Sequence, residues 1–240
     1  MLLPEGATLW GNSLLIADGR SVKRLHEGQL SLVAAKRVTP GFSTASGIII
    51  GGDNAAYISA PRQGRVFRFD LNNPSVQEFS SGMNWPTSLA RLWSGEIAIA
   101  ETGSGQILKI TSDGLLSPVT YSLLSPLALT ADRTRLLVAE PDGGRIVALR
   151  EQEAISSVAS ELSKPVGLAQ DRRGRTFIVE RGRAALTVRR LDGHLVRMID
   201  NLPLGNFPGP YPREVPVVAS PEGTLWLVLA GDGRILRVEP

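Results

Sequence analysis

Two glutamates near the ends of the chain, Glu5 and Glu214, could hold a metal ion together. Each precedes a short apolar run that could form a strand, at a point where an internal repeat is expected to turn side chains toward a central channel. Calcium and magnesium prefer oxygen ligands, which carboxylates with serine or threonine support can supply. The two residues therefore predict a site for one of these cations. Two alternatives stay open: both carboxylates face water, or one of them pairs with Arg213.

A long insertion, residues 201–213 (NLPLGNFPGPYPR), is the second feature that could bind a ligand. It exceeds the length that the repeat requires, and it is dense in proline, glycine and aromatic residues. Loops of this kind often carry function in a repeat fold, although a rigid connector is the alternative. We expect the loop and the matching channel positions to supply the ligand-binding residues Thr87, Ser125, Phe207, Tyr211 and Arg213.

Acidic residues recur at the end of one apolar run in each of four repeats, at Asp18, Glu101, Glu140 and Glu180. They could form a ring of carboxylates. Asp and Glu beside glycines also accept backbone N–H bonds, and so cap the turn that follows. A position that recurs across the repeat usually serves the repeat, so a structural role is the favoured interpretation.

Several classes of function have no support in the sequence. With 0 cysteines there is no disulfide, thiol nucleophile or thiolate metal site. The motifs of serine hydrolases, P-loop enzymes and dinucleotide-binding folds are absent. The net charge is only +3 and the arginines are scattered, which argues against nucleic acid as a partner. No apolar run is long enough to span a bilayer and no signal peptide is evident, so we expect a cytoplasmic protein with no membrane partner.

The elements that would position these residues are short strands in a repeat of about 40 residues. Residues 164–193 show the pattern best: three apolar runs separated by polar turns with Gly and Asp, which is typical of an antiparallel meander. Six such units fill the chain, and most end in a weaker fourth run. The pattern predicts an all-β, six-bladed β-propeller in one domain, residues 1–240, with four-stranded antiparallel blades. The last blade stops at its third strand, and only Met1–Leu3 could complete it.

Four stretches of the chain resemble known propeller families. Residues 201–215 followed by 220–229 resemble the bacterial strictosidine-synthase-like proteins, as does the preceding segment 135–150. Residues 3–10, leading into 14–18, are similar to the start of the gluconolactonase (senescence-marker-protein) family. The PVGLAQDRRG pattern at 165–174 resembles NHL repeats.

The resemblance to gluconolactonases implies a divalent cation in the central channel, held by an early glutamate and by Asn and Asp side chains from later blades. Glu5 matches the early glutamate. The later positions fall on Thr87, on Ser125 or Leu127, and on Val166, which are not ligands of that kind.

These observations favour a propeller that binds a small organic ligand and carries out metal-assisted hydrolysis of a lactone or ester at a degenerate site. The alternative is a non-catalytic, NHL-type scaffold for a protein partner. Its candidate anchors, unless they lie between blades, are the tryptophans Trp10, Trp85, Trp93 and Trp226.

Overall fold

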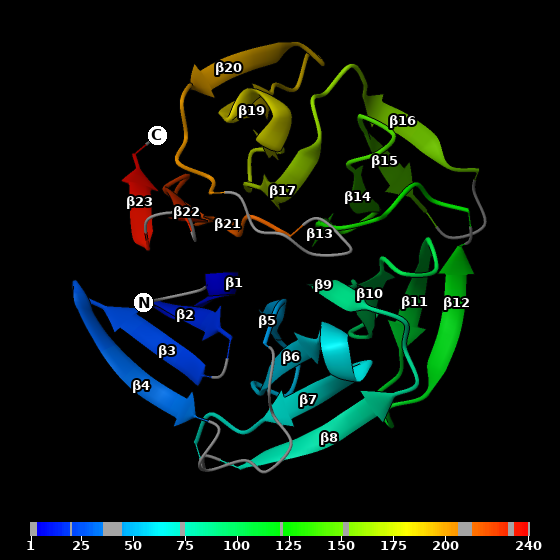
Figure 1. The fold of residues 1–240 in the computed structure, drawn as a ribbon, viewed down its shortest axis with the longest axis vertical. Coiled ribbons are helices and arrows are strands. Elements are labelled where there is room, and N and C mark those ends of the chain that lie inside the picture. Colours follow the sequence, from blue (N-terminus) through cyan, green and yellow to red (C-terminus); the bar gives the residue numbers. More distant parts are fainter. Residues whose placement is uncertain are drawn as a thin grey trace.

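The computed structural model describes residues 4–19, 21–35, 45–72, 75–120, 122–150, 154–205, 213–229 and 233–239. Six antiparallel sheets stand around a central axis as the blades of a propeller (Figure 1). Five blades have four strands each, and the sixth has three among the described residues. The predicted six-bladed fold is confirmed, and Met1–Leu3 lie outside the described residues.

Each blade is a meander whose first strand lies nearest the axis (Figure 1). Blades one and two comprise β1 (Pro4–Trp10), β2 (Ser13–Asp18), β3 (Ser21–His26), β4 (Gln29–Ala35), β5 (Ile48–Ile50), β6 (Ala56–Ala60), β7 (Arg65–Phe69) and β8 (Val76–Ser81). Blades three and four comprise β9 (Pro86–Arg91), β10 (Ile97–Glu101), β11 (Gln106–Ile110), β12 (Leu116–Thr120), β13 (Leu129–Ala131), β14 (Leu136–Glu140), β15 (Arg145–Leu149) and β16 (Ser156–Ala159). Blades five and six comprise β17 (Pro165–Gln170), β18 (Thr176–Glu180), β19 (Ala185–Arg189), β20 (Leu195–Ile199), β21 (Val217–Ala219), β22 (Leu225–Leu229) and β23 (Arg234–Val238). Two short 3-10 turns, η1 (Pro61–Gln63) and η2 (Arg181–Arg183), join second to third strands.

The second strand of each blade is its most buried element. Every residue of β10, β14 and β18 is buried. Blades pack face to face, so both faces of these strands are covered, which explains why they read as continuous apolar runs. The outer strand β20 is exposed or half-buried along its whole length. Burial is therefore greatest in the second strands, and it is lower both in first strands such as β13, which lie at the axis, and in the outer strand β20.

The hydrophobic core lies between neighbouring blades rather than within any one of them. Buried side chains of blades one and two form one cluster, and those of blades five and six form another. The ring closes where β1 contacts β21 and β22 (Figure 1). Among the described residues, the fully buried side chains at this closure are Leu14, Ile16 and Val228, with six partly buried apolar side chains packed against them. In the part of the chain that the structure describes, the interface that closes the ring therefore has the fewest buried apolar side chains.

No helix among the described residues is both long and apolar enough to cross a membrane.

Candidate functional site

A cavity of about 370 Å³ occupies the centre of the ring. The first strands of all six blades contribute to its wall through residues 6–9, 47–50, 88–91, 129–131, 168–170 and 216–219, together with Glu214. Most of these side chains are small or aliphatic. Two of the lining residues are charged, Glu214 and Arg91. The volume lies within the range of small-molecule sites.

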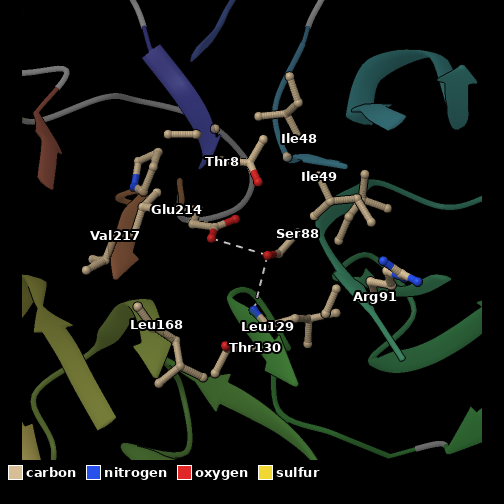
Figure 2. Close-up of a pocket in the computed structure, with 18 of the residues that line it drawn as sticks. Thr8, Ile48, Ile49, Ser88, Arg91, Leu129, Thr130, Leu168, Glu214 and Val217 are labelled. Carbon is tan, nitrogen blue, oxygen red and sulfur yellow. Dashed lines mark hydrogen bonds between the residues drawn. The ribbon is translucent and has the colours of Figure 1, made fainter. Parts of the chain in front are cut away.

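Glu214 forms the floor of this cavity. Its segment precedes β21 in blade six, and its carboxylate reaches across the axis to Ser88 of β9, in the opposite blade (Figure 2). Ser88 Oγ donates to Glu214 Oε1 over 3.2 Å and accepts from the backbone N–H of Leu129 over 3.1 Å. One hydroxyl thereby joins blades three, four and six at the axis.

The second carboxylate oxygen of Glu214 is a buried polar atom without a partner. Oε2 is inaccessible and makes no hydrogen bond with any described residue. Burial raises the pKa of Glu214 to about 8, and the hydrogen bond from Ser88 opposes that rise only in part. The side chain is therefore mostly a neutral carboxylic acid at pH 7. A neutral carboxylic acid offers an O–H donor as well as acceptor oxygens.

The open end of the cavity lies where the first strands end. Arg91, the last residue of β9, is exposed there, and the half-buried Thr130 and Gln170 lie on the same rim. The guanidinium of Arg91 makes no ion pair or hydrogen bond with any residue that the structure describes. The cavity thus has a cationic mouth and an acidic floor.

Glu5 lies on the other side of Glu214, in a separate and much smaller pocket of about 10 Å³. Arg213 Nη1 donates to Glu5 Oε1 over 2.6 Å. Arg181 lies in the same pocket and donates to the carbonyl oxygens of Gly205 and Arg213. Burial raises the pKa of Glu5, and the charge of Arg213 opposes that rise. The alternative in which Arg213 pairs with a glutamate is confirmed for Glu5.

The strand register shows that Glu5 and Glu214 are not equivalent positions. Glu214 stands where other first strands begin with proline: Pro4 pairs with Asp18, and Pro165 pairs with Glu180. The backbone N–H of Val215 bonds to the carbonyl of Val166, and the carbonyl of Pro216 accepts from Val228. Val215 therefore corresponds to Glu5, and the equivalence expected from the sequence is wrong by one residue.

The described side chains do not fit a divalent cation held by Glu5 and Glu214. They contain no group of three or more His, Cys, Asp or Glu side chains that could hold a metal ion. The carboxylate of Glu5 is engaged by a guanidinium, and the two arginines of its pocket would repel a cation. Of these two glutamates, Glu214 is the one with a buried oxygen that has no hydrogen-bond partner among the described residues.

The other predicted ligand-binding residues lie in different places. Thr87 is 4% exposed and does not line the cavity; its hydroxyl bonds to Thr102 and to the carbonyl of Leu127. Ser125 donates to Asp142, also away from the cavity. Phe207 and Tyr211 lie outside the described residues. In blade three, the residues that line the channel begin one position after the expected one, at Ser88 instead of Thr87. Successive side chains on a strand point to opposite faces, so this shift of one residue changes which side chains face the channel.

The strand position that Ser88 occupies carries a sequence signal for the site that the sequence prediction missed. Gly6, Gly47 and Gly167 occupy it, and a Cβ on any of them would lie 1.9 to 2.5 Å from a backbone carbonyl oxygen of the next blade. Ser88 is the equivalent residue in blade three, where it meets Glu214. Ala128 and Pro216 occupy this position in blades four and six, so Ser88 is the one residue there with a polar side chain. Nothing in the local sequence of Arg91 distinguishes it from other turn arginines.

The recurring glutamates serve the blades, as the structural interpretation predicts, but through a different donor. Glu101 accepts from the backbone N–H of Asn84 over 2.6 Å, and Glu140 accepts from that of Leu124 over 2.6 Å. Glu180 accepts from the N–H of Ser163 over 2.7 Å. These donors lie in the connection that precedes each blade, not in the turn that follows the glutamate. The carboxylates thus fix the entry of the chain into the first strand.

No protein-family model matches the sequence, and no curated protein matches it either. Solved structures do match it in shape. A gluconolactonase from Xanthomonas campestris has a TM-score of 0.73 at 16% identity, over 94% of this chain and 82% of that one. A calcium-binding protein, regucalcin, from Agrobacterium tumefaciens has a TM-score of 0.72 at 17% identity, over 95% and 82%. A chain in a nidogen/laminin complex has a TM-score of 0.78 at 14% identity, over 95% and 89%.

These proteins differ in what they bind, while their fold is shared. At such identities the likeness extends to the fold and not to the site. The resemblance predicted from the sequence is confirmed at this level: the chain has the six-bladed propeller fold of the gluconolactonase-like and regucalcin-like proteins.

Proposed function

We propose that this propeller binds a small organic ligand in its central cavity, with Glu214 as the polar group that holds the ligand at the floor. The observation that supports this most is the unpartnered Oε2 of Glu214. A buried polar atom without a hydrogen bond destabilises a protein by roughly 1–3 kcal/mol. A ligand that accepts a hydrogen bond from the neutral carboxyl would offset that loss.

The protonation state sets the kind of group that meets the floor. A neutral carboxylic acid donates to a carbonyl, ether or hydroxyl oxygen, and a glutamine amide can replace it as a donor. A leucine of similar size cannot. Glu214→Gln should therefore keep ligand binding at pH 7, and Glu214→Leu should abolish it.

The experiment is a fragment screen by ligand-observed NMR, repeated on variants that remain folded by circular dichroism. Fragments that bind the cavity should be lost in Glu214→Leu and in Thr130→Trp, which fills the mouth. They should be kept in Glu222→Leu, which changes an exposed glutamate of the same blade. Fragments that bind both cavity variants as well as the parent would refute the proposal.

Metal-assisted hydrolysis of a lactone or ester is the finer function that the family resemblance implies. It requires Glu5 and Glu214 to share a cation, which the pairing of Glu5 with Arg213 opposes. Thermal melts with calcium, magnesium, manganese and zinc test it, since an ion that binds only the folded state raises the melting temperature. A rise that Glu5→Gln and Glu214→Gln both abolish would favour the hydrolase over simple ligand binding.

The alternative function, a scaffold for a protein partner, would require a contiguous apolar patch. Trp93, 43% exposed, is the one exposed tryptophan among the described residues. It lies in a groove together with Leu191 and several arginines. Other exposed apolar side chains, such as Leu32, Leu115 and Met198, lie on outer strands or turns of three different blades. The central cavity is therefore the better-supported site.

A further inference from the structure

We propose, building on the function above, that the ligand of the central cavity is a small organic anion. Its anionic group binds Arg91 at the mouth, and its neutral polar end meets Glu214 at the floor. The comparisons do not assign this site or this ligand class. The charges that line the cavity and those that surround its mouth favour this class of ligand.

Arg91 is the only cationic side chain among the described residues that line the cavity. Figure 2 shows it on the same wall as Ser88, at the far end of β9 from Glu214. The guanidinium has no acidic partner among the described residues, so its donors are available to an incoming anion. Guanidinium groups bind carboxylate and phosphate through paired hydrogen bonds.

The acidic residues near the mouth are already neutralised. Asp132 pairs with Arg135 over 3.1 Å, and Asp171 pairs with Arg175 over 2.7 Å. Asp53 of the neighbouring turn pairs with Arg68 over 2.7 Å. The acidic groups of the turns nearest Arg91 are therefore engaged by other arginines, and the exposed Glu222 lies on the corresponding turn of blade six, across the ring from β9.

Further arginines extend the positive charge outward from the mouth. Arg91 also lines a surface groove of about 1470 Å³, which runs over the turns of blades three to five. Arg133 and Arg172 lie in this groove, are exposed, and have no ion-pair partner among the described residues. Clustered charge of one sign raises the local concentration of oppositely charged ligands.

The spacing along the wall limits the ligand. Ser88 and Arg91 are three positions apart on one extended strand, which places their Cα atoms roughly 10 Å apart. The wall around them is largely apolar, and Ile48, Ile49 and Leu129 are among its lining residues (Figure 2). A molecule that reaches both ends therefore has an anionic group and a neutral hydrogen-bond acceptor joined by a short apolar body.

The test repeats the fragment screen with equal numbers of anionic, neutral and cationic fragments. The anionic fragments are divided into two arms, carboxylates and phosphate esters. Fragments whose binding depends on Glu214 should be mainly anionic. Their affinity should fall about tenfold in Arg91→Gln, the loss of one charge-assisted hydrogen-bond pair, and less in Arg91→Lys. The control Arg197→Gln removes the same charge from the outer strand β20 and should leave affinity unchanged.

Two results would overturn the proposal in distinguishable ways. Glu214-dependent fragments that are neutral or cationic, or anionic fragments that bind Arg91→Gln unchanged, would refute the anion while the cavity function stands. A screen without any Glu214-dependent fragment would refute both. Dominance of one anionic arm would support the proposal and identify the anion as carboxylate or phosphate.

Discussion

Replacing Glu214 by glutamine should remove a pH dependence from the stability of the protein. The folded pKa of this carboxyl is about 8, and its ordinary value is 4.5. Well below pH 4.5 the carboxyl is protonated in both the folded and the unfolded state, so its pKa shift does not reduce the free energy of unfolding. As the pH rises further, the unfolded chain releases the proton while the folded protein holds it, so stability falls until the pH reaches about 8.

The magnitude follows from the size of the pKa shift. One pH unit corresponds to about 1.4 kcal/mol, so a shift from 4.5 to about 8 amounts to roughly 5 kcal/mol at most. Between pH 5 and pH 8 the wild-type protein should lose up to roughly 4 kcal/mol relative to Glu214→Gln. Other titratable groups add their own pH dependence to both proteins, so the difference between the two proteins is the quantity to measure.

The assay is urea denaturation of both proteins at half-unit steps from pH 5 to pH 9. The free energy of unfolding of Glu214→Gln minus that of wild type should rise steadily and level off above pH 8. Glu222→Gln should track the wild type throughout. A difference in the free energy of unfolding that stays constant from pH 5 to pH 8 would refute the conclusion that Glu214 is buried and neutral.

Other predictions concern its neighbours and the ring. Ser88→Ala removes the donor to Glu214 and the acceptor of the Leu129 N–H, so urea denaturation should show a loss of about 1–3 kcal/mol; a loss no larger than that of the exposed Ser94→Ala would contradict the site geometry. Arg213→Met leaves Glu5 unpaired and should destabilise the protein by about 1–3 kcal/mol, an effect that Glu5→Gln should largely cancel; additive losses would mean that the pair does not interact. Hydrogen exchange should be faster in β1 and β22 than in β17 and β18, because the closing cluster is the smallest; equal protection would contradict this. Binding of anionic fragments should weaken above pH 8, as Glu214 ionises and repels them; an unchanged affinity from pH 7 to pH 9 would argue against contact with the floor.

The strands could be predicted from the sequence because their signals are local. Residues 164–193 form β17, β18 and β19, as their apolar runs and turns indicate. The Asp-Arg-Arg-Gly turn ends at Gly174, whose φ of +80° suits glycine. Continuous apolar runs identified the second strands because each is covered on both faces. The recurring glutamates were correctly assigned to structure, although their donors lie further away along the chain.

The site could be predicted only in part, because it depends on partners from opposite blades. The insertion before Glu214 concealed its register, so the residue was aligned with Glu5 instead of with the prolines that begin other blades. Ser88 and Glu214 are 126 positions apart, and no local pattern joins them. The pairing of Glu5 with Arg213 spans 208 positions and was foreseen only as an alternative.

The measurement that tests the central claim most directly is a calorimetric titration of the tightest cavity fragment into four proteins at pH 7. Wild type, Glu214→Gln and Glu222→Leu should bind it with affinities within a few-fold of one another. Glu214→Leu should show no binding, since leucine offers no hydrogen bond at the floor of the cavity. Binding of the same fragment to Glu214→Leu at wild-type affinity would contradict the claim that Glu214 holds the ligand.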